Sequence, residues 1–230
     1  YIYNGSAQGP NAATNTGTGS SYTFSYVGTG ETTYAASSTL PTAAGTYTAT
    51  ATVAANGDFG SASSDATSFS IATKDLTITA NNAAKCFGET YTLENTAFTS
   101  SGLQNEETIG SVTLTSSGVS SDAAAASYSI VPSDATGGTF TASNYSINYV
   151  NGSLVVNPVS VGGTIAGGAT VCSGTNSTEL TLSGHTGSVT RWESSLDGFA
   201  TSGTPIANTT ETLTATNLAA TTSYRAVVTS

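Results

Sequence analysis

The strongest constraint on the fold of this chain is a strict alternation of side chains between residues 46 and 53. Thr occupies positions 46, 48, 50 and 52, and Tyr47, Ala49, Ala51 and Val53 occupy the positions between them. Successive side chains of a strand point to opposite faces, so a period of two predicts a β-strand with one buried face.

Shorter runs rich in Thr, Val, Tyr and Ile recur along the chain and predict further strands. They lie at residues 68–71, 76–79, 112–114, 127–131, 145–149, 154–156, 180–182, 189–192, 213–215 and 224–228. Clusters of Gly, Asn, Asp and Ser separate the runs at a spacing of about 8–12 residues, which is typical of a β-sandwich or barrel. Asn151-Gly152 is predicted to form a hairpin turn. Residues 122–126 fit either one helical turn or a loop of small residues.

Two strand ends predict domain boundaries. One precedes Lys74-Asp75, and the other is Asn157-Pro158, where Pro lacks the N–H group that a ladder needs. The units are residues 1–72 (N-terminal module), 73–158 (central module) and 159–230 (C-terminal module). Each has the size of an immunoglobulin-like (Ig-like) β-sandwich. The short joins predict an all-β tandem array of three such domains in an elongated rod.

The ends of the sequence point to a segment of a longer polypeptide. The chain has no Met, opens on Tyr1-Ile2-Tyr3 and closes on the strand-like residues 226–230. We therefore expect the C-terminal module to be truncated at its C-terminal end.

Composition excludes several classes of protein. With 37% apolar residues and 11 Tyr the chain can build a core, so we do not expect disorder. Only four residues are Lys or Arg and the net charge is −10, which excludes a surface that follows nucleic-acid phosphates. No apolar run approaches the roughly 18 residues of a membrane helix, so no membrane insertion is expected.

The candidate catalytic residues are few, and we expect no enzyme. His185 is the only His and lies between Gly residues, which predicts an exposed loop. No acid is expected to orient it as a catalytic base. Glu106 and Glu107 are adjacent, so on a strand they would point to opposite faces, and a solvated loop is the better interpretation.

We predict no metal or cofactor, because the sequence offers too few ligand residues close together. Two Cys and one His cannot supply the ligands of a structural Zn²⁺ site. Ca²⁺ needs several oxygen ligands in one place. Asp75 at the first join, with Asn81 and Asn82 near it in sequence, leaves Ca²⁺ at the joins as a weaker possibility.

Three aromatic residues are predicted to have structural roles. Tyr47 and Tyr224 fit the position of a tyrosine corner, in which the hydroxyl group binds a nearby backbone group. Trp192 lies mid-strand and fits the core between two sheets, although a lone Trp can also stack on a sugar. Tyr22, Tyr26 and Tyr34 are the side chains available for an exposed aromatic platform.

Short motifs of the N-terminal module lie at residues 3–8, 34–35, 41–47 and 69–71. Those of the central module are Leu76-Thr77-Ile78-Thr79-Ala80, Lys85-Cys86-Phe87-Gly88 and residues 144–147 and 152–154. Through these motifs the first two modules resemble the MBG-type β-sandwich repeats of large bacterial surface proteins. The C-terminal module resembles the Ig-like repeats of giant secreted Bacteroidota adhesins, through residues 171–177, Arg191-Trp192-Glu193-Ser194-Ser195, residues 206–210 and residues 218–228.

These resemblances imply an extracellular, cell-surface repeat array that is exported by type IX secretion and carries no catalytic residues. They also imply that Cys172 forms a disulfide bond with a Cys beyond residue 230. We expect Cys86 to be a buried small apolar residue, as free Cys residues commonly are. A Cys86–Cys172 bond would require the rod to fold back.

The expected function is that of a stalk or spacer in a secreted surface adhesin, which extends a binding region away from the cell. Its expected partners are neighbouring repeats of the same polypeptide and surface polysaccharide. Two alternatives remain open. One is a segment of an extracellular filament assembled through strand contacts, and the other is a carbohydrate-binding module of a secreted enzyme.

Overall fold

The computed structural model describes residues 1–230 and confirms the all-β fold. All predicted strand runs lie within strands. The only helix is the short 3₁₀ helix η1 (Ala142–Asn144), and residues 122–125 form a loop that leads into a strand beginning at Ala126.

In the N-terminal module, one sheet contains β1 (Tyr22–Gly28), β2 (Gly45–Val53), β3 (Ala62–Ser63) and β4 (Thr67–Ile71). The order is β1-β2-β3, and β4 also pairs with β2. The alternating segment is β2, whose Tyr47 and Ala49 are buried while the Thr side chains between them are less so. Residues 1–3 contribute only an isolated parallel bridge between Ile2 and Ala72.

The central module contains two sheets. The first has the order β10-β5-β7, with β5 (Lys74–Ala80), β7 (Phe98–Ser101) and β10 (Tyr145–Val150). The second has the order β6-β11-β9-β8, with β6 (Ala83–Cys86), β8 (Ile109–Thr115), β9 (Ala126–Gly138) and β11 (Gly152–Asn157).

The predicted hairpin at Asn151-Gly152 is wrong, because β10 and β11 belong to different sheets. β10 pairs with β5 and β11 pairs with β6, both in parallel. The chain crosses from one sheet to the other between β10 and β11. At this crossing, a Cβ atom on Gly152 would lie 2.6 Å from the carbonyl oxygen of Ala80 and 2.7 Å from that of Asn81. Gly152 is therefore needed for close backbone approach rather than for a hairpin turn.

The C-terminal module also has two sheets, ordered β12-β13-β16 and β15-β14-β17. Their strands are β12 (Thr164–Ala166), β13 (Ser177–Ser183), β14 (Ser188–Ser195), β15 (Thr204–Ile206), β16 (Thr212–Thr216) and β17 (Ser223–Thr229). Leu180, Leu182 and Leu213 from one sheet pack with Val189 and Trp192 from the other. The result is a small sandwich-like core.

The chain divides into two compact units. The first comprises residues 1–81, 93–115 and 130–152, and the second comprises residues 82–92, 116–129 and 153–230. In the first unit a single apolar core joins residues on both sides of the predicted boundary at residue 72. Its buried members are Tyr3, Tyr47, Ile71, Leu76, Ile78, Val112, Ala135 and Tyr145.

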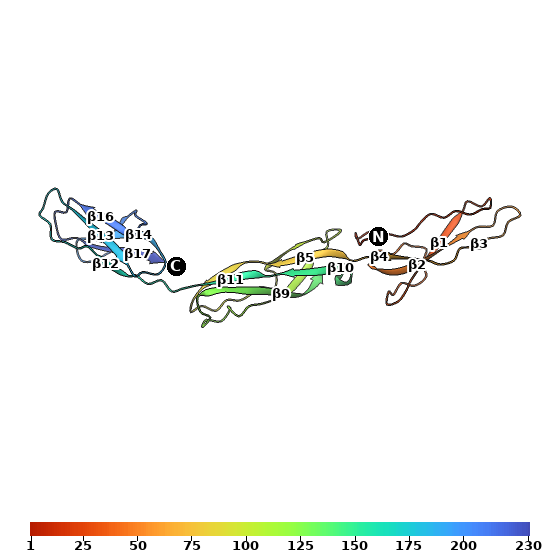
Figure 1. Cartoon of the computed structure of the whole chain (residues 1–230), viewed down its shortest axis with the longest axis horizontal. Coiled ribbons are helices and arrows are strands. Elements are labelled where there is room, and N and C mark those ends of the chain that lie inside the picture. The colour runs from red at the N-terminus through yellow and green to blue at the C-terminus, as the bar shows by residue number, and fades with distance from the viewer. The chain divides into compact units, whose positions relative to one another are not determined.

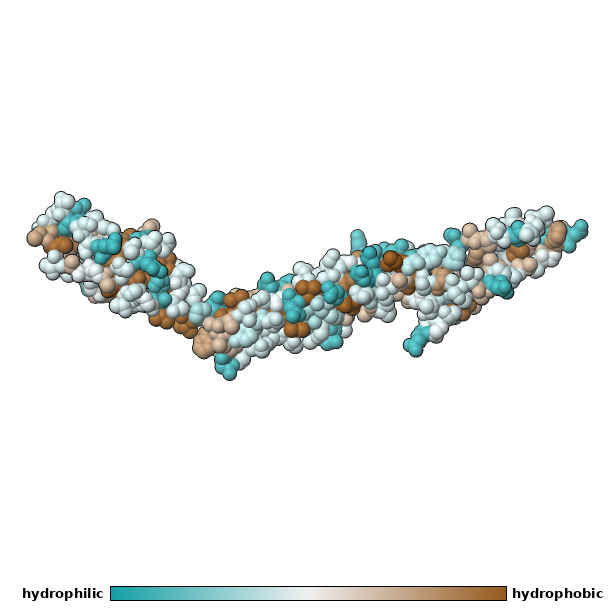
Figure 2. All heavy atoms as spheres, viewed as in Figure 1, coloured by the Kyte–Doolittle hydropathy of each residue, from teal (hydrophilic) through white to brown (hydrophobic).

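Two features of the chain are visible directly, namely the pairing of β5 with β10 and the hydropathy of the surface. β5 and β10 lie side by side, as their pairing requires (Figure 1). The visible surface is mostly of near-neutral hydropathy, with strongly hydrophilic and hydrophobic side chains scattered over it (Figure 2). This agrees with a composition in which Ser and Thr make up about a third of the residues.

Candidate functional site

In the first unit, the carboxylate of Glu107 accepts hydrogen bonds from two Tyr side chains. The hydroxyl group of Tyr3 donates a hydrogen bond of 2.6 Å to its Oε1 atom, and the hydroxyl group of Tyr145 donates one to its Oε2 atom. The two rings pack edge to face, with centroids 5.3 Å apart. Tyr3 belongs to the N-terminal module and the other two residues to the central module, so the bond from Tyr3 crosses the boundary between the two modules. We call Tyr3, Glu107, Asn144 and Tyr145 the joint cluster.

Further hydrogen bonds cross the same boundary. The buried Asn144 accepts a bond of 2.9 Å from the backbone N–H group of Ala44 through its Oδ1 atom. The side chain of Asn105 donates a bond of 2.6 Å to the carbonyl oxygen of Gly5. Because these bonds surround a shared apolar core, the two modules are fixed to each other by more than the short linker.

Burial raises the pKa of the Tyr3 and Tyr145 hydroxyl groups above the ordinary value of 10.0, and the Glu107 carboxylate raises both further. The backbone N–H group of Gln104, which donates to the Tyr145 oxygen at 3.0 Å, acts in the opposite direction for that residue. Both phenols therefore stay neutral, as hydrogen-bond donors, to a higher pH than an ordinary Tyr side chain.

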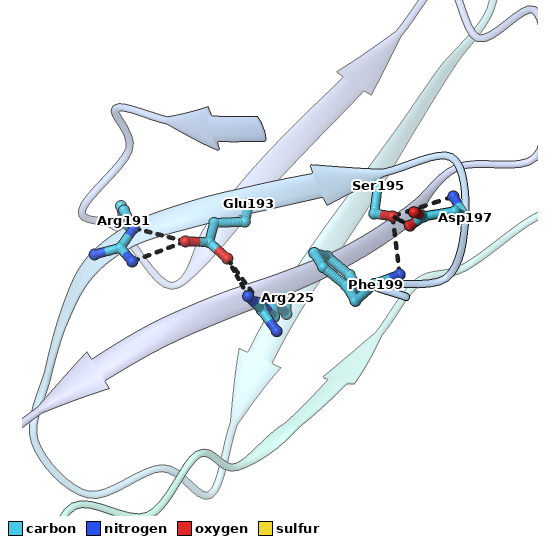
Figure 3. Close-up of polar contacts among 6 residues, drawn as sticks. All are labelled: Arg191, Glu193, Ser195, Asp197, Phe199 and Arg225. Atoms are coloured by element: carbon cyan, nitrogen blue, oxygen red, sulfur yellow. Dashed lines mark hydrogen bonds and ion pairs between the residues drawn. The ribbon is translucent and has the colours of Figure 1, made fainter. Parts of the chain in front are cut away.

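A second polar cluster lies on β14 and β17 of the C-terminal module (Figure 3). Glu193 is buried and lies opposite Arg225 in the register of the two strands. Its Oε1 atom accepts hydrogen bonds from Arg191, with the Nε atom at 2.8 Å, and its Oε2 atom accepts from Arg225, with the Nε atom at 2.7 Å. These two Arg residues are half of the basic residues of the chain.

A capped turn positions an aromatic ring beside this cluster (Figure 3). Ser195 Oγ accepts the N–H group of Phe199 at 2.9 Å, and Asp197 Oδ2 accepts the N–H group of Thr201 at 3.1 Å. Phe199 has a positive φ of 65°. Its ring centroid lies 4.4 Å from the guanidinium carbon of Arg225, within the range of a cation–π contact.

Hydrogen bonds from Arg225 and Arg191 lower the pKa of Glu193. The pKa of Asp197 falls to about 2, first because of the Ser195 hydroxyl group and then because of Thr201. Both carboxylates are charged at neutral pH. Since the charges of both guanidinium groups are directed at Glu193, the cluster links two strands of one sheet.

In the second unit, Lys85 on β6 is 5% exposed. Its ammonium group donates a hydrogen bond of 2.7 Å to the carbonyl oxygen of Glu89 and another to that of Ser120. The residue therefore connects two loops to the end of β6. The two backbone acceptors offset the desolvation cost of burying its ammonium group.

The three aromatic residues predicted to be structural are all in packed positions. The Tyr47 hydroxyl group donates a bond of 2.8 Å to the carbonyl oxygen of Ala43. Trp192 is fully buried, and its Nε1 atom donates to the carbonyl oxygen of Thr210 at 2.9 Å. Tyr224 is partly buried and packs against the same core, whereas the backbone hydrogen bond of a tyrosine corner stays a prediction for this residue.

Two predictions about polar side chains are wrong. His185 is not an exposed loop residue: its side chain is 13% exposed, and its Nε2 atom lies 3.8 Å from Glu211 Oε1, an acid that we did not expect near it. Glu107 is not in a solvated loop, because its carboxylate binds the two Tyr hydroxyl groups, whereas Glu106 beside it is exposed.

Both Cys residues are free thiols in this chain. Cys172 is exposed, and its bond to a Cys beyond residue 230 stays a prediction. Cys86 is only partly buried, so the expected full burial of its side chain is wrong. It lies on the edge strand β6, which has a paired strand on one side only.

The aromatic platform that sugar binding would need is not formed by Tyr22, Tyr26 and Tyr34. Tyr26 is buried and donates to the carbonyl oxygen of Pro10 at 2.8 Å. Tyr34 packs edge-on against Tyr47, with ring centroids 5.8 Å apart. Only Tyr22 and Tyr34 keep partial exposure.

Acidic side chains do not gather into a metal site. No group of three or more His, Cys, Asp or Glu side chains lies together, and Asp75 is exposed. The structure contains no helix with the length and apolar character needed to cross a membrane.

Two family models match separate segments of the chain. Residues 76–155 match the family model of the MBG domain (YGX type), which supports the MBG resemblance of the central module and a repeat-type module there. Residues 161–230 match a family described as Domain of unknown function (DUF8696). No curated protein matches the chain. Neither family match covers the N-terminal module, so its MBG resemblance stays a prediction.

Reasoning from the sequence missed Glu107, Glu193 and Lys85. A usable signal exists for Glu193, because Arg191 and Glu193 are two residues apart on a strand and so share a face. Glu107 binds Tyr3 and Tyr145, and Lys85 binds Ser120 as well as the nearby Glu89, so both residues depend on partners far along the chain that no local pattern marks.

Proposed function

We propose that the chain is a non-catalytic stalk or spacer segment of a giant extracellular repeat adhesin, with three all-β modules arranged end to end. One observation carries the proposal: a continuous core and the joint cluster fasten the N-terminal module to the central module. A stiff join is what a spacer needs, because a flexible one would let the binding region collapse toward the cell. Location at a bacterial cell surface and type IX export belong to the same proposal.

Small-angle scattering on the purified chain, with Ca²⁺ and with chelator, tests the shape. We expect an elongated particle about three domains long that chelator does not change. A compact particle would contradict the tandem array. A species that grows with protein concentration would favour the filament alternative.

The stiffness of the join can be measured separately with spin labels at Asp58→Cys and Ser100→Cys, which replace exposed residues of the first unit. Cys86→Ala and Cys172→Ser remove the native thiols. We expect a narrow distance distribution that broadens when Glu107→Ala and Asn144→Ala are added. A distribution that is already broad in the parent would remove the support for a rigid spacer.

A further inference from the structure

The first two strands of the central module, β5 and β6, pair in parallel with its last two strands, β10 and β11. In the first unit β5 pairs with β10, from Lys74 opposite Tyr145 to Thr79 opposite Val150. In the second unit β6 pairs with β11, from Ala83 opposite Leu154 to Cys86 opposite Asn157. The register is the same in both pairs, at a separation of 71 residues, and the Asn82 side chain accepts the Ser153 N–H group at that separation, at 2.9 Å.

We infer that this parallel pairing makes the central module a mechanical clamp, which resists tension applied along the chain. The strand that comes first is pulled toward its N-terminus, and the strand that comes last is pulled toward its C-terminus. In a parallel pair these two directions are opposite and lie along the strands. All hydrogen bonds of the ladder are then loaded together in shear, instead of breaking one after another.

Buried side chains support the ladder over its length. Leu76 and Ile78 on β5 and Leu154 on β11 are each 0% exposed, so sliding either pair would also drag apolar side chains through the core. Lys85, fixed by two backbone carbonyl groups, holds β6 to its neighbouring loops.

The C-terminal module has no such pair. Its first strand, β12, has three residues and pairs antiparallel with β13, whereas its last strand, β17, lies in the other sheet and pairs with β14. Tension between its ends is carried by a short edge strand and by packing between sheets. We therefore expect the C-terminal module to unfold at a lower force than the central module.

The decisive experiment pulls the full chain in two directions with single-molecule force spectroscopy, in a Cys86→Ala, Cys172→Ser background. Handles at Asp75→Cys and Asn151→Cys load β5 against β10 in shear. Handles at Asp75→Cys and Ser146→Cys pull on two exposed register partners and peel the same strands apart. Chemical unfolding of both variants checks that their native stabilities match.

We expect the rupture force in shear to be roughly twofold or more above that in peeling, because the ladder breaks cooperatively only in shear. Equal forces in the two directions would overturn the inference. Such a result would leave the spacer role standing, since a spacer needs stiffness and extension but not a directional clamp.

A second measurement pulls the chain from Tyr1 and Ser230. Ala84→Cys and Val155→Cys, exposed register partners on β6 and β11, form a disulfide staple under oxidising conditions. The staple prevents the residues between the two Cys from extending. The unfolding step whose gain in chain length becomes smaller on oxidation therefore belongs to the central module. We expect that step at a higher force than the step of the C-terminal module; the reverse order would overturn the clamp.

Discussion

The hydroxyl group of Tyr3 lies 2.6 Å from Glu107 Oε1, although 104 positions separate the two residues in the chain. The bond joins the first strand-like residues of the N-terminal module to a loop of the central module. Its partner bond from Tyr145 makes the Glu107 carboxylate the acceptor of two largely buried phenols.

Replacing Glu107 by Ala should lower the free energy of unfolding by about 1–3 kcal/mol, because two hydroxyl groups lose their acceptor in a buried setting. Glu106→Ala is the matched control, since Glu106 is adjacent but exposed, and we expect a change within about 0.5 kcal/mol. Chemical denaturation followed by far-UV circular dichroism measures both. Fluorescence of Trp192, which reports on the C-terminal module, should not change. Equal effects of the two variants would contradict the role of Glu107.

The same cluster predicts a loss of stability at high pH. The pKa of Tyr145 in the folded chain lies well above the ordinary 10.0, and that of Tyr3 is raised as well. Below pH 10 both phenols are neutral in the folded and unfolded states, so their contribution is constant. Above pH 10 the unfolded state loses these protons first, and stability falls until the folded-state pKa is reached.

Comparing the free energy of unfolding at pH 9 and pH 11 for the parent and for Tyr145→Phe tests this expectation. The variant should lose less stability over this interval than the parent, because it removes one of the titrating phenols. An equal loss in both proteins would show that other groups cause the alkaline dependence.

The strands could be predicted because their signals are local. β2 shows its period of two within its own residues, and so its buried Tyr47 and its Thr face could be assigned. What could not be predicted is how strands combine. Asn151-Gly152 is a turn signal in any context, and only the carbonyl groups of Ala80 and Asn81, about 70 residues earlier, make it a crossing between sheets.

The same limit applies to the polar sites. Glu106 and Glu107 are identical in type and adjacent, yet one is exposed and the other binds Tyr3. The difference arises from a tertiary contact between modules, which neither composition nor spacing contains. Trp192 was assignable because a large apolar ring in the middle of a strand has few places other than the core.

The Arg191–Glu193–Arg225 cluster predicts acid sensitivity in the C-terminal module. The two Arg residues lower the pKa of Glu193 below its ordinary 4.5, so its stabilising effect is fully present above pH 4.5 and is lost as the pH falls through the folded-state pKa. Glu193→Gln should lower the denaturant midpoint of the Trp192 fluorescence transition at pH 7. The difference in denaturant midpoint between Glu193→Gln and the parent should be smaller at pH 3 than at pH 7. Glu179→Gln, an exposed position on β13, is the control and should leave the midpoint unchanged. A constant difference at both pH values would contradict the role of the charge.

The crossing between β10 and β11 predicts that Gly152 cannot be enlarged without cost. In Gly152→Ala the added Cβ atom would lie 2.6 Å and 2.7 Å from two backbone carbonyl oxygens, which cannot move without disturbing β5. We expect the variant to lose about 1–3 kcal/mol of unfolding free energy, as is usual for overpacked sites. Gly162→Ala is the matched control, because an added Cβ atom there meets nothing within 4 Å, and its effect should stay within about 0.5 kcal/mol. The loss should appear in the circular dichroism transition and leave the Trp192 fluorescence transition in place. If Gly152→Ala is as stable as Gly162→Ala, the close approach of the two strands at the crossing is not a constraint on the fold.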